Sequence, residues 1–262
     1  MTTTAGDVDG LGFSTDEMMT VAAARELRNG QVCFVGIGLP STAANLARGL
    51  HAPDIVLVYE SGTIGAKPRT LPLSIGDGEL ADTADAVVPV PEIFNYWLQG
   101  GRIDVGMLGG AQLDRFANLN TTVIGRYDAP KVRLPGAGGA PEIAGSCKEV
   151  IIVLRQSVRT FVEHLDFVTT FGFGTGRGDR EKLGLRGGGP SLVVTDLGLL
   201  RPDPATCELT LTEIHPGVEL DAVRQATGWT LAVSPTLAIT PPPTAAELSL
   251  LRCLQQEKGT RV

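Results

Sequence analysis

The sequence contains few cysteine and histidine residues, and they are widely spaced. Four cysteines and three histidines occur among 262 residues, and no two cysteines form a C-x-x-C pair. Such spacing gives no support for a Cys/His metal site, so we expect no bound metal. The histidines lie at turns or in ordinary packing positions, and Cys33 and Cys147 adjoin apolar runs and are expected to be buried thiols. The seven residues are Cys33, Cys147, Cys207, Cys253, His51, His164 and His215.

Long apolar runs and clusters of basic residues are also missing. No apolar stretch approaches the roughly 20 residues that a membrane-spanning helix needs. The first residues lack the basic region and apolar core of a secretory signal. The net charge is −7, and lysine and arginine are scattered rather than gathered in a stripe, which argues against a nucleic-acid or membrane surface. We therefore expect a cytoplasmic protein that binds neither nucleic acid nor membrane.

Several common catalytic and nucleotide-binding motifs are absent. The sequence contains neither G-x-G-x-x-G nor the P-loop pattern, and neither G-x-S-x-G nor H-E-x-x-H. The glycine-rich stretch 136–139 fails the dinucleotide pattern because Pro141 takes the place of the third glycine. A Ser–His–Asp arrangement stays open, although no serine lies in a recognisable nucleophile turn.

Glycine, in contrast, is abundant. The chain has 33 glycines in 262 residues, almost twice the usual share of about 7%. They are not periodic but follow the predicted strands, where tight turns and close backbone approach require a residue without a Cβ. The main groups fall at 36–38, 62–65, 106–110, 136–139 and 172–178.

Short apolar runs alternate with helix-like segments along the chain, the first helix beginning at a Ser14–Glu17 capping box. This alternation predicts an α/β fold with an open, mostly parallel sheet and helices on both faces. No repeat or linker is evident, so we expect a disordered tail over residues 1–12 and a single domain over residues 13–262. The predicted strands are 32–36, 55–59, 86–89, 104–108, 151–154, 192–195 and 209–214, and the predicted helices are 14–29, 40–46, 93–98, 218–227 and 244–256.

A glutamate at a strand end is the most informative single residue. The apolar run 55–59 leads directly into Glu60, and two glycines, Gly62 and Gly65, follow within five residues. In open α/β sheets ligands bind at the carboxyl ends of strands. An unpaired carboxylate there is costly unless it faces a cleft or a partner. Glu60 is therefore either a functional residue or one that caps a helix or pairs with an arginine.

A carboxylate at this position suits one kind of chemistry in particular. It is ionised at neutral pH and can attack a thioester carbonyl without a general base. Such an attack develops an oxyanion, which backbone N–H groups in a glycine loop can stabilise. The stretch 136–140 is a candidate loop, although a tight turn without function explains it equally well.

The motifs, taken together and in order, resemble those of the B subunit of family I CoA-transferases. The resemblance runs from about Ser14 to the final helix, and it lies in the branch of the glutaconate and 3-oxoadipate CoA-transferases. The matching stretches are Asn29-Gly30-Gln31-Val32, Val35-Gly36-Ile37-Gly38-Leu39-Pro40, Ala52-Pro53-Asp54, Glu60-Ser61-Gly62, Gly109-Gly110-Ala111-Gln112-Leu113-Asp114, Asn118-Leu119-Asn120, Pro130-Lys131-Val132-Arg133, Gly136-Ala137-Gly138-Gly139-Ala140, Leu183-Gly184-Leu185, Val194-Thr195-Asp196 and His215-Pro216-Gly217-Val218.

The resemblance implies roles for particular residues. Glu60 takes the position of the family's nucleophile, which forms a covalent thioester with coenzyme A, and Ser61 and Gly62 complete its Glu-Ser-Gly form. Gly138 and Gly139 fall in the loop beside the thioester. Gln112 matches a glutamine next to that site, with a hydrogen-bonding role in the core as its alternative. The implied fold is the open α/β sheet shared with sugar-phosphate isomerases.

The resemblance also implies substrates and a partner. A separate A subunit carries much of the CoA-binding surface, and the two assemble as a hetero-oligomer, α2β2 or larger. No cofactor is permanently bound, because coenzyme A is itself the substrate and part of the covalent intermediate. Three stretches, 34–40, 73–80 and 96–104, are most similar to the 3-oxoadipate enzymes of aromatic catabolism, which take CoA from succinyl-CoA.

The same resemblance leaves other functions open. The acceptor could be glutaconate or another dicarboxylate. Relatives on this fold hydrolyse or decarboxylate CoA thioesters, but with the glutamate replaced, and Glu60 is present here. A non-catalytic sensor or scaffold subunit is a further alternative, since fold alone does not determine function.

Overall fold

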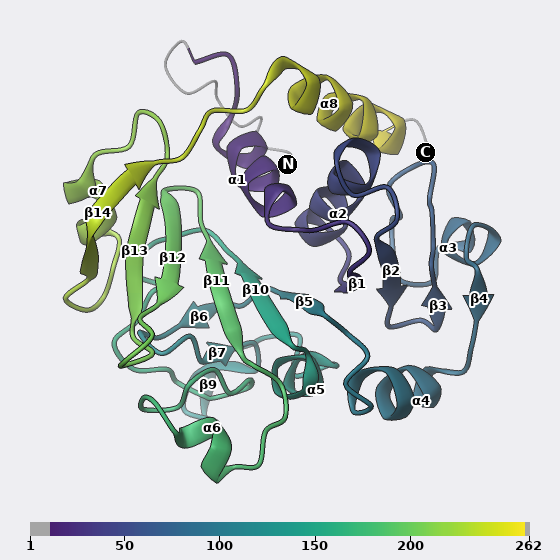
Figure 1. Cartoon of the computed structure of the whole chain (residues 1–262). Helices are drawn as coiled ribbons and strands as arrows, with labels where there is room; N and C mark the ends of the chain where they lie inside the picture. The colour runs from purple at the N-terminus through teal and green to yellow at the C-terminus, as the bar shows by residue number, and fades with distance from the viewer. Residues whose placement is uncertain (1–10, 260–262) are drawn as a thin grey trace.

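A ten-stranded open sheet runs through the middle of the protein in the computed structural model, which describes residues 11–259 (Figure 1). The strand order across the sheet is β14-β13-β12-β11-β10-β5-β1-β2-β3-β4. Residues 1–10 of the predicted disordered tail lie outside the described residues. The strands are β1 (Val32–Val35), β2 (Val56–Tyr59), β3 (Thr63–Ile64), β4 (Ala86–Val87), β5 (Val105–Leu108), β10 (Glu149–Val153), β11 (Pro190–Val194), β12 (Gly198–Pro202), β13 (Leu209–Ile214) and β14 (Ala232–Ile239).

The centre of this sheet is parallel and its flanks are mixed. Strands β2, β1, β5, β10 and β11 pair in parallel, and β13 pairs in parallel with β14. Antiparallel pairs join β11 to β12, β12 to β13, β2 to β3 and β3 to β4. The predicted open, mostly parallel sheet is confirmed, with the antiparallel pairs confined to the flanks.

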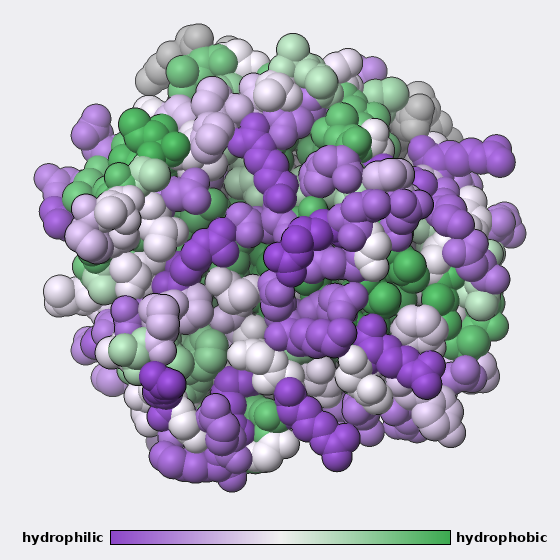
Figure 2. All heavy atoms as spheres, in the orientation of Figure 1, coloured by the Kyte–Doolittle hydropathy of each residue, from purple (hydrophilic) through white to green (hydrophobic). Residues whose placement is uncertain are grey.

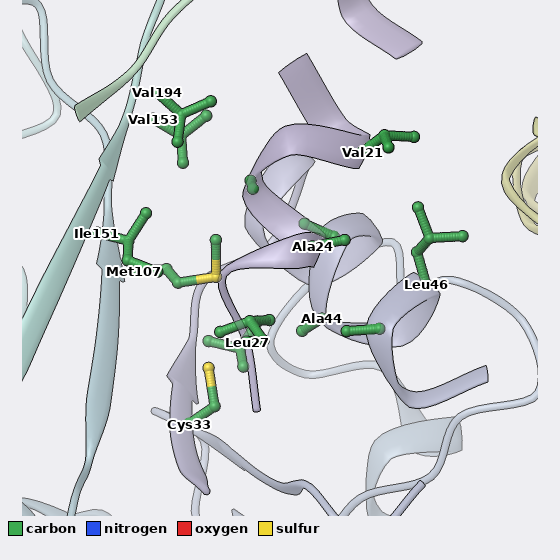
Figure 3. Close-up of a cluster of buried hydrophobic side chains, with 14 of the residues drawn as sticks. Val21, Ala24, Leu27, Cys33, Ala44, Leu46, Met107, Ile151, Val153 and Val194 are labelled. Atoms are coloured by element: carbon green, nitrogen blue, oxygen red, sulfur yellow. The ribbon is translucent and has the colours of Figure 1, made fainter. Parts of the chain in front are cut away.

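Three helices lie on one side of the sheet, the last of them packed on the other two. They are α1 (Thr15–Arg25), α2 (Leu39–Leu50) and α8 (Ala245–Gly259), which lie together above the sheet in Figure 1. Strand residues such as Met107, Ile151 and Val194 pack against apolar residues of α1 and α2 in one buried cluster (Figure 3). The predicted capping box at the start of α1 is present, with Ser14 and Glu17 each bonding the other's backbone N–H.

The opposite face is covered by shorter helices and by two hairpins. A second buried cluster joins Phe34, Val58 and Ile152 of the strands to Ile93, Leu98 and Ile143 of the covering elements. Because both faces of the central strands are buried, these strands read as continuous apolar runs in the sequence. The covering elements and remaining helices are α3 (Gly78–Asp82), α4 (Val90–Glu92), the π-helix η1 (Ile93–Leu98), α5 (Ala140–Ser146), α6 (Asp179–Lys182) and α7 (Leu220–Gln225), with β6 (Gln112–Leu113) pairing β7 (Leu119–Asn120) and β8 (Val123–Gly125) pairing β9 (Pro130–Arg133).

The strands that the sequence pattern misses are those with polar residues or proline. β12 contains Arg201 and Pro202, and β14 contains Pro235 within an exposed or half-exposed run. Since β14 is an edge strand, the missing N–H of its proline breaks no essential ladder bond. The surface shown in Figure 2 is mainly polar, with apolar residues in small groups. No described helix combines the length and apolar character needed to cross a bilayer.

Candidate active site

The carboxyl ends of four neighbouring parallel strands meet at one edge of the sheet. The last residues of β1 and β2, Val35 and Tyr59, are paired in register, and Leu108 at the end of β5 pairs with Ile152 near the end of β10. Each strand leads into a loop at this edge, and glycines follow directly after β1 and β5. This is the edge at which α/β sheets bind ligands.

Glu60 enters this edge directly from β2, on a turn whose shape is fixed. The Gly62 N–H donates a 3.0 Å hydrogen bond to the Tyr59 carbonyl and closes the turn. Gly62 has φ +106°, and a Cβ there would lie 2.0 Å from the Val88 carbonyl oxygen, so only glycine fits. The hydroxyl oxygen of Ser61 is buried and has no hydrogen-bond partner among the described residues. The turn therefore presents Glu60 from a rigid base.

The Glu60 side chain extends toward the glycine loop. A Cβ built on Gly139 would lie 3.4 Å from Glu60 Oε1 and 2.9 Å from two ring carbons of Phe94. Glu60 is half-buried, and its carboxylate makes no hydrogen bond or ion pair with any of residues 11–259. The alternatives in which Glu60 caps a helix or pairs with an arginine thus find no support in these contacts.

The glycine loop has an unusual backbone and leaves two N–H groups without an acceptor among the described residues. Gly136 and Gly138 have φ values of +102° and +49°, which L-residues adopt rarely. Gly139 then caps α5, with its carbonyl accepting a 3.0 Å hydrogen bond from the Ile143 N–H. Neither the Gly138 nor the Gly139 N–H donates to another described residue. The loop therefore has two backbone donors without an acceptor among the described residues, and one of them belongs to Gly139, the residue beside Glu60.

Phe94 forms the apolar wall of the site, and the sequence pattern did not single it out. It belongs to η1, and its ring meets Phe34 edge-on with centroids 6.4 Å apart. The run 93–98 predicted a helix, but not the π-helical register that turns Phe94 toward Gly139. π-Helical turns occur often at functional sites, but the apolar pattern used to predict helices does not distinguish a π-helix from an α-helix.

The predicted site residue Gln112 belongs to a buried hydrogen-bond network. It is buried, and its Nε2 donates a 2.8 Å hydrogen bond to Asp166 Oδ2. Its Oε1 accepts hydrogen bonds from Asn120 Nδ2 at 2.7 Å and from the Asp166 N–H at 3.1 Å. No hydrogen bond joins Gln112 to Glu60 among the described residues. The structure thus brings Glu60, Gly62, Gly138 and Gly139 to one edge and places Gln112 in a hydrogen-bonded core.

Three side chains of types that could carry other chemistry, His215, Cys33 and Cys147, are buried. His215 is hydrogen-bonded to the Thr240 hydroxyl and to the Thr195 carbonyl, and burial lowers its pKa. Cys33 and Cys147 are buried thiols as predicted, and burial raises the pKa of Cys147 to about 12. Among the described residues no group of three His, Cys, Asp or Glu side chains is arranged to hold a metal ion.

The arrangement suits nucleophilic attack on a carbonyl carbon. The Glu60 carboxylate has no hydrogen-bond or ion-pair partner among the described residues, and it lies beside Gly139 of the glycine loop and near the Phe94 ring. Donors fixed in advance stabilise a developing oxyanion better than solvent does, because they need no reorganisation. Since a carboxylate needs no general base, the lack of a nearby histidine is no obstacle to this chemistry.

Comparison with known proteins points to one family. Residues 16–226 match the family model described as Coenzyme A transferase. The chain is 63% identical over 243 residues to the B subunit of 3-oxoadipate CoA-transferase from Pseudomonas knackmussii, covering 93% of this chain and 94% of the relative. It is 36% identical over 250 residues to the B subunit of glutaconate CoA-transferase from Acidaminococcus fermentans, covering 93% of each. The crystal structure of glutaconate coenzyme A-transferase from Acidaminococcus fermentans superposes with a TM-score of 0.87 at 35% identity, covering 92% of this chain and 94% of that one.

Proposed function

The chain belongs to the coenzyme A transferase family, and from this premise we propose that it is the B subunit of a 3-oxoadipate CoA-transferase. The enzyme would move coenzyme A from succinyl-CoA to 3-oxoadipate in the breakdown of aromatic compounds. The observation that carries the proposal is the Glu60 carboxylate, which has no hydrogen-bond or ion-pair partner among residues 11–259 and lies beside Gly139 of the glycine loop. Identity of 63% to the B subunit of a 3-oxoadipate CoA-transferase supports the choice of substrates.

The proposed reaction is a ping-pong cycle on Glu60. Its carboxylate attacks the thioester carbonyl of succinyl-CoA, giving a mixed anhydride and CoA thiolate. The thiolate then attacks the glutamyl carbonyl, which releases succinate and leaves a glutamyl-CoA thioester. The carboxylate of 3-oxoadipate attacks this thioester, again giving an anhydride and thiolate. Attack of the thiolate on the 3-oxoadipyl carbonyl releases 3-oxoadipyl-CoA and restores the Glu60 carboxylate.

The residues around Glu60 supply what these steps need. Each attack develops negative charge on a carbonyl oxygen, which the Gly138 and Gly139 N–H groups can stabilise as hydrogen-bond donors. Phe94 limits access of water to the anhydride from one side, which favours transfer over hydrolysis. Contacts to the distant parts of coenzyme A can offset the strain of bringing the reacting groups together.

The proposal includes a second polypeptide. Relatives of this chain are named as B subunits, so an A subunit is the expected partner. We propose that the A subunit completes the coenzyme A surface and that the two form a hetero-oligomer, α2β2 or larger. Because part of the acid pocket can come from the A subunit, tests of activity require the complex.

The test is a transfer assay on the co-purified complex. With succinyl-CoA as donor, we expect 3-oxoadipate to be the preferred acceptor over glutaconate. We expect Glu60→Gln to abolish transfer and Glu219→Gln, a change at an exposed carboxylate at the start of α7, to leave it intact. Preference for glutaconate would favour the glutaconate-type alternative. Steady release of coenzyme A without any acceptor would favour a thioester hydrolase, and transfer that survives Glu60→Gln would refute the proposed nucleophile.

A further inference from the structure

Thr121 anchors the start of the glycine loop through two hydrogen bonds with Gly136. The Gly136 N–H donates to the Thr121 carbonyl at 2.9 Å, and the Thr121 hydroxyl donates to the Gly136 carbonyl at 2.8 Å. Among the described residues, no other group hydrogen-bonds to the Gly136 backbone. The far end of the loop is held by α5, where Gly139 accepts from the Ile143 N–H at 3.0 Å. Between these two anchors lie Ala137 and Gly138.

Thr121 lies in a turn that a buried asparagine holds closed. Asn120 is fully buried, and its Oδ1 accepts from the Thr122 N–H at 2.9 Å and the Val123 N–H at 3.3 Å. Its Nδ2 donates to the Val123 carbonyl at 2.6 Å. The backbone of Thr121 is fixed further by its N–H, which donates to the Thr169 hydroxyl at 2.9 Å. Thr121, which hydrogen-bonds to Gly136 of the loop, thus lies in a backbone segment that Asn120 and Thr169 fix by hydrogen bonds.

The same network continues away from the loop into the core. The second hydrogen of Asn120 Nδ2 goes to Gln112 Oε1 at 2.7 Å, and Gln112 in turn is fixed by Asp166. All hydrogen-bonding positions of the Asn120 amide are thus used. Fully satisfied buried networks rigidify the backbone that they hold. The chain of contacts runs from Asp166 through Gln112, Asn120 and Thr121 to Gly136.

We propose that Thr121, held by Asn120, is a positioning residue that keeps the Gly138 and Gly139 N–H groups aimed at the reacting carbonyl; this inference rests on the proposed function. A loop with three glycines in four residues has no strong conformational preference of its own, so its shape must come from outside anchors. Gln112 then acts on the reaction through the loop and not by touching the substrate. A displacement of about 1 Å at such donors can lower the rate about 100-fold.

The experiment compares three variants of the complex. Thr121→Val keeps the shape of the side chain but removes the hydroxyl that bonds Gly136, and Thr121→Ser keeps the hydroxyl. The matched control is Thr212→Val on β13, which removes a 3.2 Å hydrogen bond from the Thr212 hydroxyl to the Leu199 carbonyl of β12. Each variant is measured for the kcat and KM of transfer from succinyl-CoA, for thermal stability, and for hydrogen exchange of the loop amides of Gly136 and Ala140, which are hydrogen-bonded in the native structure.

We expect Thr121→Val to lower kcat about 10- to 100-fold with little change in KM. We expect Thr121→Ser to restore most of the rate and Thr212→Val to match the wild type. Exchange of the loop amides should rise in Thr121→Val alone. Equal kcat in Thr121→Val and Thr212→Val, or a Thr121→Ser variant as slow as Thr121→Val, would overturn the inference.

Failure of the proposed function is distinguishable from failure of this inference. A wild-type complex that transfers no coenzyme A would refute the proposed function, whatever the variants do. The exchange measurement needs no activity, so it tests the anchor in either case. Unchanged exchange at the Gly136 and Ala140 amides in Thr121→Val would then refute the positioning role.

Discussion

Substitution of Gly139 by alanine gives a prediction whose size follows from the geometry. Gly139 has φ −83° and ψ 0°, a conformation that alanine adopts without strain. The added Cβ would lie 2.9 Å from Phe94 Cε1 and Cζ and 3.4 Å from Glu60 Oε1. Carbon atoms in proteins approach to about 3.5–4.0 Å. The Phe94 ring or the loop must therefore move by roughly 0.6 Å or more.

The consequence is expected to fall mainly on activity. Crowding of this kind costs about 1–3 kcal/mol of stability. Movement of the loop would also shift the donor N–H groups relative to Glu60, and a misplacement approaching 1 Å can lower the rate about 100-fold. That loss corresponds to about 2.7 kcal/mol of transition-state stabilisation. We expect Gly139→Ala to fold, with kcat reduced by about this factor.

The assay is the rate of coenzyme A transfer by the complex, with thermal unfolding measured in parallel. Gly78→Ala is the matched control, because a Cβ there meets nothing within 4 Å and the residue lies in α3. Phe94→Leu in the Gly139→Ala background should regain part of the rate, because it removes the ring carbons that the Cβ would meet. If Gly139→Ala is as active as Gly78→Ala, or if Phe94→Leu gives no relief, the reasoning is refuted.

Three further predictions concern single groups. Glu60→Gln should lower turnover at least about 1,000-fold without loss of stability, as measured by steady-state kinetics and thermal unfolding. Burial opposes ionisation of Glu247, but hydrogen bonds from Arg25 and Thr244 prevail and hold its pKa at about 2, below the usual 4.5. The free energy of unfolding that this ionised group contributes is therefore present above a pH of about 4.5 and is lost as the pH falls toward 2. Glu247→Gln should reduce the fall in the free energy of unfolding over this pH range, measured by urea unfolding at each pH. A fall of unchanged size would contradict the assignment. Iodoacetamide should alkylate the exposed Cys253 in the native protein and reach the buried Cys147 only after unfolding, which peptide masses would reveal.

The centre of the fold could be predicted from sequence because its signals are local and strong. Strands buried on both faces are continuous apolar runs, and β1, β2, β5 and β10 stand out for that reason. The capping box at Ser14 is likewise a pattern within four residues. The short hairpins and β14 were not predictable in this way, because their residues are polar or exposed and their pairing depends on distant parts of the chain.

Some residues of the candidate site could likewise be predicted from local sequence patterns, and others could not. Glu60 and the glycine loop follow from a carboxylate at a strand end and from glycine spacing, although their proximity required the fold. Phe94 was missed because its orientation depends on a π-helical turn, which has no distinct sequence pattern. The contacts of Gln112 with Asn120 and Asp166 join residues 8 and 54 positions apart, which no local pattern reveals.

The most direct test of the central claim is the intact mass of this chain after the complex is incubated with succinyl-CoA and no acceptor. We predict an increase equal to coenzyme A less water, located on the peptide that contains Glu60, removed by hydroxylamine, and absent in Glu60→Gln. A chain of unchanged mass in a complex that binds the donor, or an adduct on another residue, would contradict the account.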